Sequence, residues 1–112
     1  MELVYQRCCG IDIHKKVIVA CVIMVMANGQ RHKEIRSFRT VIGELLQLLD
    51  WLKAAGCTHV AMESTGVYWK PIYNLLEGHF ELLVVNAQPI KAVPGRKVRR
   101  EVAERIALQR EL

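Results

Sequence analysis

The sequence predicts an α/β domain built on a mixed β-sheet with helices on both faces. Three segments rich in strand-forming residues follow one another near the start with short connections, so they are expected to pair as antiparallel strands. Two later apolar segments, 58–63 and 80–85, are separated by a segment of helical periodicity, and helix-linked strands pair in parallel. With 112 residues, 52% hydrophobic and 24% charged, we expect a single compact domain over residues 1–112.

The first three strands are expected over 7–14, 17–26 and 31–39. Lys15-Lys16 suit a short turn between the first two. Asn28-Gly29 is a strong hairpin signal, because both residues tolerate positive φ. Charged residues surround Ile35 in the third segment, which is typical of an exposed edge strand.

Apolar residues then recur at helical spacing from 41 to 52, with Thr40 as a plausible N-cap and Gly56 as a natural terminator. A strand over 58–63 ends on Glu63. A short helix is expected within 67–78, in which Pro71 is tolerated only in the first turn.

A strand over 80–85, a loop over 86–97 and a final helix over 100–112 complete the order β-β-β-α-β-α-β-α. This is the order that the RNase H-like fold requires. In that fold the first strand is central and the strand after the first helix lies beside it. Asp12 and Glu63 are therefore predicted to be neighbours, although they are far apart in the chain.

Asp12 stands between two isoleucines in GIDIH, on a strand predicted to be buried. An ionised carboxylate buried without a partner costs several kcal/mol or more. Asp12 would therefore face solvent, interact with Lys15 or Lys16, or bind a metal ion. Two converging carboxylates can hold Mg²⁺ or Mn²⁺, and a pair of such ions about 4 Å apart can promote phosphodiester cleavage.

The composition indicates the class of binding partner and the cellular compartment that we expect. The formal net charge of +5 favours a polyanionic partner. The four cysteines show no zinc-binding spacing, and adjacent Cys8 and Cys9 would point to opposite faces of a strand, so reduced thiols in the core are expected. No signal peptide or membrane-spanning run is apparent, and we expect a cytoplasmic protein.

Three blocks of sequence carry a resemblance to a known family: GIDIHKK at 10–16, AMESTGVYWKPIYNLLEG at 61–78 and VVNAQPIKAVPGRK at 84–97. Together they resemble the N-terminal catalytic domain of the DEDD transposases of the insertion sequence 110 family, which are similar in fold to Holliday-junction resolvases of the RuvC type. The resemblance implies a Mg²⁺- or Mn²⁺-dependent DNA transposase or recombinase that cleaves and joins strands. It also implies DNA and a structured guide RNA as partners and leaves a homo-oligomer open.

By this resemblance Asp12 and Glu63 match the first two catalytic, metal-binding carboxylates of the family. The last two correspond to Arg99 and Val102, neither of which has a carboxylate. Glu101 and Glu104 keep the spacing of the pair but are displaced by two residues, roughly 200° around a helix. The family's serine-bearing C-terminal domain is also expected to be absent.

Whether the chain is an enzyme by itself is left open, and we expect that it does not cleave DNA alone. The alternative is a non-catalytic remnant that binds nucleic acid or dimerises. An actin-like ATPase is disfavoured, because no glycine-rich phosphate loop follows Asp12.

Further residues are candidates for nucleic-acid contact. Tyr68 and Trp69 could stack on bases or pack in the core. His14 could add to a metal site or be a turn histidine. The segment 91–112 holds seven basic and three acidic side chains, and its basic residues either contact phosphates or form a solvated surface. The candidates there are Lys91, Arg96, Lys97, Arg99 and Arg100.

Overall fold

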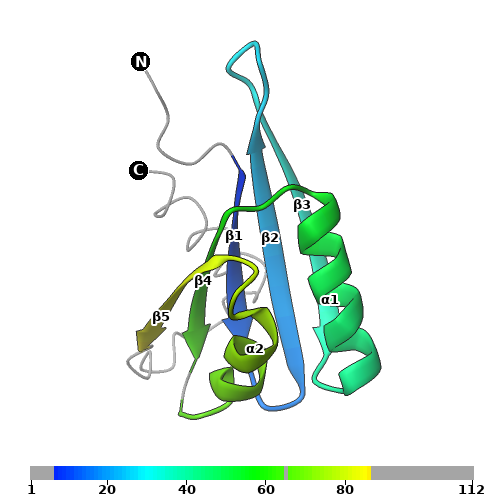
Figure 1. Ribbon diagram of the computed structural model, residues 1–112, viewed down its shortest axis with the longest axis vertical. Coiled ribbons are helices and arrows are strands. Elements are labelled where there is room, and N and C mark those ends of the chain that lie inside the picture. Colours follow the sequence, from blue (N-terminus) through cyan, green and yellow to red (C-terminus); the bar gives the residue numbers. More distant parts are fainter. Residues whose placement is uncertain (1–6, 65, 87–112) are drawn as a thin grey trace, which may run out of the picture.

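The computed structural model describes residues 7–64 and 66–86, which form one mixed sheet with two helices packed against it (Figure 1). The strand order within this part is β3-β2-β1-β4-β5. The strands are β1 (Arg7–Ile13), β2 (Val17–Val25), β3 (Arg31–Arg39), β4 (His59–Ser64) and β5 (Glu81–Asn86), and the helices are α1 (Ile42–Ala54) and α2 (Trp69–Leu76).

The pairing of the strands follows from their connections. β1, β2 and β3 are joined by short turns and pair antiparallel, whereas β4 and β5 each follow a helix and pair parallel to β1 and β4. Gly29, with φ +84°, makes the predicted hairpin between β2 and β3. The mixed sheet and the central place of β1 confirm the predicted topology.

Both described helices cover one face of the sheet. Alternate residues of β1 and β4, among them Ile11 and Met62, point into this core and meet the apolar sides of α1 and α2. Pro71 is the third residue of α2, within its first turn, as predicted. The helix predicted over 100–112 and most of the preceding loop lie outside the described residues.

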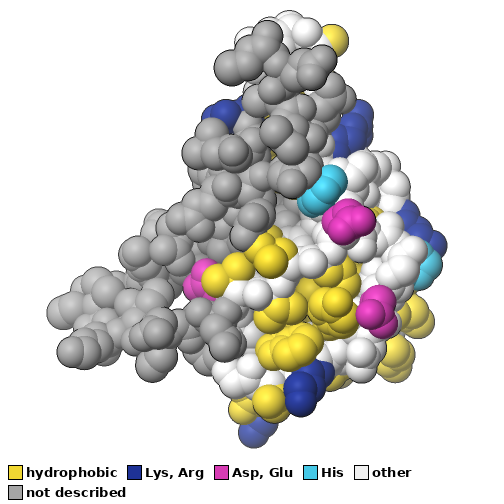
Figure 2. Space-filling view, turned by 60° about the vertical axis from the view of Figure 1, so that its left-hand side comes forward, with side chains coloured by type: hydrophobic (Ala, Val, Ile, Leu, Met, Phe, Trp, Pro, Cys, Tyr) yellow, Lys and Arg dark blue, Asp and Glu magenta, His cyan; other side chains and the backbone are white. Residues whose placement is uncertain are grey.

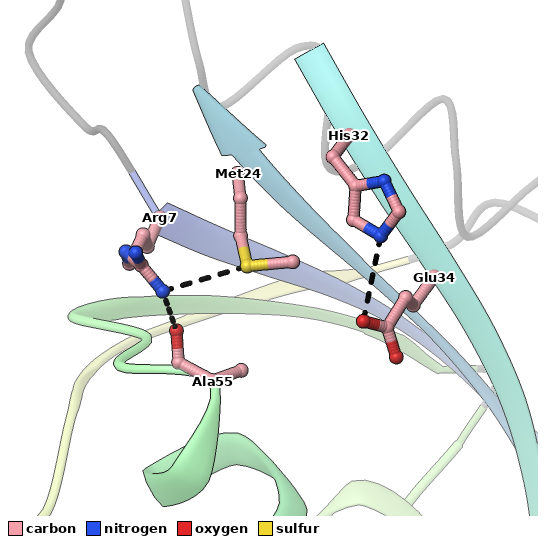
Figure 3. Close-up of polar contacts among 5 residues, drawn as sticks. All are labelled: Arg7, Met24, His32, Glu34 and Ala55. Carbon is pink, nitrogen blue, oxygen red and sulfur yellow. Dashed lines mark hydrogen bonds and ion pairs between the residues drawn. The ribbon is translucent and has the colours of Figure 1, made fainter. Parts of the chain in front are cut away.

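The two ends of α1 are held by contacts that are distant in the chain. The prediction that Thr40 caps α1 is wrong, because the Thr40 hydroxyl donates to the Lys15 carbonyl over 2.8 Å. Val41 takes the N-cap position, without a side-chain cap. At the other end, Arg7 Nη1 donates to the Ala55 carbonyl over 2.7 Å (Figure 3). The guanidinium thus adds positive charge where the helix dipole is negative.

Strand β3 forms one edge of the sheet and carries mostly charged and exposed residues, as predicted. His32 and Glu34 lie on this strand with His32 Nε2 at 3.5 Å from Glu34 Oε1 (Figure 3). Within the described ranges no helix is long and apolar enough to cross a bilayer.

The four cysteines are buried thiols. Cys9 and Cys57 belong to the core under the helices, whereas Cys8 and Cys21 belong to a smaller apolar cluster that includes Val19 and Ile23. Cys8 and Cys9 thus point to opposite faces of β1, as predicted.

Candidate functional site

The carboxyl ends of β1, β3, β4 and β5 lie at the same end of the sheet, the lower end in Figure 1. The β1–β2 turn, the β3–α1 connection and the β4–α2 connection also lie there. Loops at the carboxyl end of parallel strands are the usual place for a site in an α/β sheet. Asp12 and Glu63 lie one residue before the ends of β1 and β4.

Asp12 and Glu63 are direct partners in the parallel β1–β4 ladder. The side chains of Ile11 and Met62, next to them in the chain, point into the core under the helices. Because side chains alternate along a strand, Asp12 and Glu63 point to the other face of the sheet. The two strands are about 4.8 Å apart, so the two carboxylates are side by side, and their predicted proximity is confirmed.

The side chain of Asp12 is buried, with 7% of the residue exposed. It has a hydrogen-bond partner in the turn that follows β1. His14 Nε2 lies 3.0 Å from Asp12 Oδ2, so the imidazole N–H donates to the carboxylate. Neither Lys15 nor Lys16 forms an ion pair with Asp12 in the described part of the chain. The expectations of a solvent-facing Asp12 or an Asp12–lysine pair are therefore wrong.

Valines flank the two carboxylates along the same row of the sheet. Val19 of β2 pairs with Asp12, and Val85 of β5 pairs with Glu63. The acidic pair therefore lies between apolar side chains in its row of the sheet. Two adjacent carboxylates repel each other when ionised, and a cation between them would offset this repulsion.

Two adjacent carboxylates fit the oxygen ligands that Mg²⁺ and Mn²⁺ prefer. No group of three or more metal-binding side chains occurs among residues 7–64 and 66–86. The donor set seen there is consistent with part of a metal site. Arg99, Val102, Glu101 and Glu104 lie outside the described residues.

The other candidate residues fall into two groups. Tyr68 is 40% exposed, whereas Trp69 packs against the core and lies edge-on to Tyr73, with the ring centroids 5.7 Å apart. The predicted phosphate-binding residues Lys91, Arg96, Lys97, Arg99 and Arg100 lie outside the described part of the chain.

The sequence interpretation missed a set of basic residues at the carboxyl end of the sheet. Lys15 and Lys16 form the β1–β2 turn, Arg39 ends β3, and Lys70 lies in the first turn of α2. All four are exposed. One available signal was that Lys15 and Lys16 follow Asp12 by only three and four residues.

The order of strands and the paired carboxylates on β1 and β4 define a domain of the RNase H-like class. Solved structures agree on the fold. The fowlpox virus Holliday junction resolvase matches with a TM-score of 0.55 at 14% identity, over 79% of this chain and 65% of that one. The fowlpox virus resolvase in complex with Holliday junction DNA matches with a TM-score of 0.52 at 14% identity, over 92% and 74%.

The family follows from the sequence match. The model of the DEDD transposases of the insertion sequence 110 family matches residues 9–102, most of the chain. The protein therefore belongs to this transposase family. A comparison with curated proteins finds no significant match.

Proposed function

We propose that this domain binds DNA and contributes Asp12 and Glu63 to a divalent-metal site used in DNA transposition. The observation that carries the proposal is the direct pairing of these residues in the β1–β4 ladder, with both side chains on one face. Membership of the transposase family supports it. A resolvase of the same fold, solved with Holliday junction DNA, supports DNA as the partner.

Each residue of the site has a distinct part. Asp12 is oriented by the hydrogen bond from His14 Nε2 to Oδ2, which leaves the second carboxylate oxygen for a metal ion. Glu63 offers its oxygens from the neighbouring strand. Mg²⁺ or Mn²⁺, when bound, would activate a water or a 3′-hydroxyl and stabilise the leaving oxygen.

A two-carboxylate site is incomplete for this chemistry. Arg99 and Val102 replace the other two carboxylates of the family pattern, and a cation at a metal site opposes metal binding. We therefore expect the 112-residue chain to leave DNA uncut in Mn²⁺. The test incubates it with linear duplex and four-way-junction DNA, and cutting that Asp12→Ala abolishes would overturn this expectation.

A non-catalytic nucleic-acid-binding domain is the second candidate. It is favoured because no group of three or more His, Cys, Asp or Glu side chains among residues 7–64 and 66–86 could hold a metal ion. Titration calorimetry with Mn²⁺ separates the two candidates. Saturable binding that Asp12→Asn removes, and that Asp50→Asn on the exposed side of α1 retains, supports the metal site; no binding by the unaltered chain supports the second candidate.

A structured guide RNA and self-association are further proposals that rest on family membership. Both are tested on the same chain, by binding to structured RNA and by sedimentation.

A further inference from the structure

The β1–β2 turn lies beside the acidic pair and presents two adjacent lysines. Lys15 and Lys16 are both exposed, and neither forms an ion pair with an acidic side chain of the described ranges. Three residues span at most about 10 Å, so Lys15 lies within that reach of Asp12.

The turn that carries the lysines is held by hydrogen bonds on both sides. The His14 N–H donates to the Val17 carbonyl over 3.0 Å. From the β3–α1 connection, the Thr40 hydroxyl donates to the Lys15 carbonyl over 2.8 Å and the Thr40 N–H to the Lys16 carbonyl over 3.2 Å. The backbone of the turn is therefore fixed, while both ammonium groups remain free to meet a ligand.

Other charged residues at this end of the sheet also favour a bound anion. Glu44, in the first turn of α1, is already paired with Arg39. Lys70 lies in the first turn of α2, which contains no acidic residue, and a cation there is disfavoured by the helix dipole. A bound anion would offset that cost.

In Figure 2 the lower end of the visible face shows Lys or Arg side chains beside hydrophobic ones, while further Lys or Arg side chains and the acidic side chains lie higher. That lower end is the end of the sheet at which the β1–β2 and β4–α2 connections lie (Figure 1).

We infer that Lys15 and Lys16 bind the phosphate backbone of DNA next to the Asp12–Glu63 pair. One strand of B-DNA presents a charge for each 3.4 Å or so of helix axis. The backbone of Lys15 is at most about 10 Å from that of Asp12, so the bound phosphate lies only a few nucleotides from one at the acidic pair. The lysines would position the strand without contacting the reacting atoms. This inference rests on the proposed function, because it assumes that DNA is the partner.

The test is fluorescence anisotropy with labelled four-way-junction DNA, in buffer without divalent metal, over a series of salt concentrations. The double variant Lys15→Gln, Lys16→Gln is compared with the unaltered chain. The matched control is Lys33→Gln, Lys53→Gln, which removes two charges from exposed positions at the opposite end of the sheet. Thermal unfolding of each variant verifies that the fold is retained.

Loss of two phosphate contacts is expected to make the plot of log K against log salt shallower by about 1.8. At 0.1 M salt this corresponds to at most about 60-fold weaker binding. The control variant should keep most of the affinity and slope.

Three outcomes would overturn the inference. If the unaltered chain binds DNA and the Lys15/Lys16 variant binds equally well, the lysine surface is wrong and the proposed function stands. If the unaltered chain binds no DNA, the proposed function fails together with the inference. If the lysine variant binds DNA as the unaltered chain does but no longer binds an RNA duplex of the same sequence, the surface is assigned to RNA instead of DNA.

Discussion

Raising the pH above 9 is expected to destabilise the fold through its buried thiols, and Cys57 allows the effect to be calculated. Burial raises the pKa of Cys57 from 9.0 to about 12. In the unfolded chain the thiol ionises near its ordinary value of about 8.5 to 9. Between these values the unfolded chain releases a proton that the folded chain keeps, so stability falls as pH rises. At pH 10 the loss is about 1.4 to 2 kcal/mol.

This loss is a large share of the 5–15 kcal/mol or so that is typical of a domain. Burial also raises the pKa of Cys9 well above its ordinary value, so its contribution adds in the same direction.

The measurement is urea unfolding at pH 7 and pH 10. Cys57→Ala should show a smaller drop in stability between the two values than the unaltered chain, by about 1.4 to 2 kcal/mol. Val60→Ala removes a buried side chain that cannot ionise, and it should lower stability about equally at both. An equal pH dependence in Cys57→Ala and the unaltered chain would refute the assignment of a raised thiol pKa.

Three further predictions concern the elements that support the site. Leu48 is 0% exposed in the core under α1, so Leu48→Ala should cost about 2–5 kcal/mol in denaturant unfolding; a cost below 1 kcal/mol would contradict the packing of α1. Arg7→Gln should lose the contact with the Ala55 carbonyl and lower stability by about 1 kcal/mol, whereas Lys16→Gln in the exposed β1–β2 turn should change it by less than about 0.5 kcal/mol. Hydrogen bonds from the backbone and side chain of Arg39 lower the pKa of Glu44. The stabilisation from ionised Glu44 is therefore present at pH values above the ordinary pKa of a glutamate and is lost as the pH falls through the lowered pKa. Glu44→Gln should therefore reduce the loss of stability between pH 5 and pH 3.

The pairing of the strands could be predicted from sequence, because it follows from local patterns and connection rules. Asn28-Gly29 favours a hairpin, and a helix between two strands favours parallel pairing. These rules give the direction of each strand, whereas the placement of β4 beside β1, and of Glu63 beside Asp12, comes from the strand arrangement that the RNase H-like fold requires.

Contacts between distant segments could not be predicted in this way. Thr40 has the composition of a helix cap, but its hydroxyl is used by the β1–β2 turn, which competes with capping. Likewise, Trp69 could have faced solvent or the core, and its contact with Tyr73 depends on how α2 packs. The proximity of His14 to Asp12 depends on the turn geometry.

The acidic pair and the lysine turn are supported by different parts of the structure, and this difference bears on their roles. Asp12 and Glu63 are held by the hydrogen bonds of neighbouring strands, which fix their relative position as a metal site requires. Lys15 and Lys16 lie on a turn whose backbone is held while its side chains stay exposed. Such side chains can follow a nucleic-acid backbone of varying path. Placing a carboxylate between isoleucines opposes local stability, and natural sequences keep such conflicts mainly at functional sites.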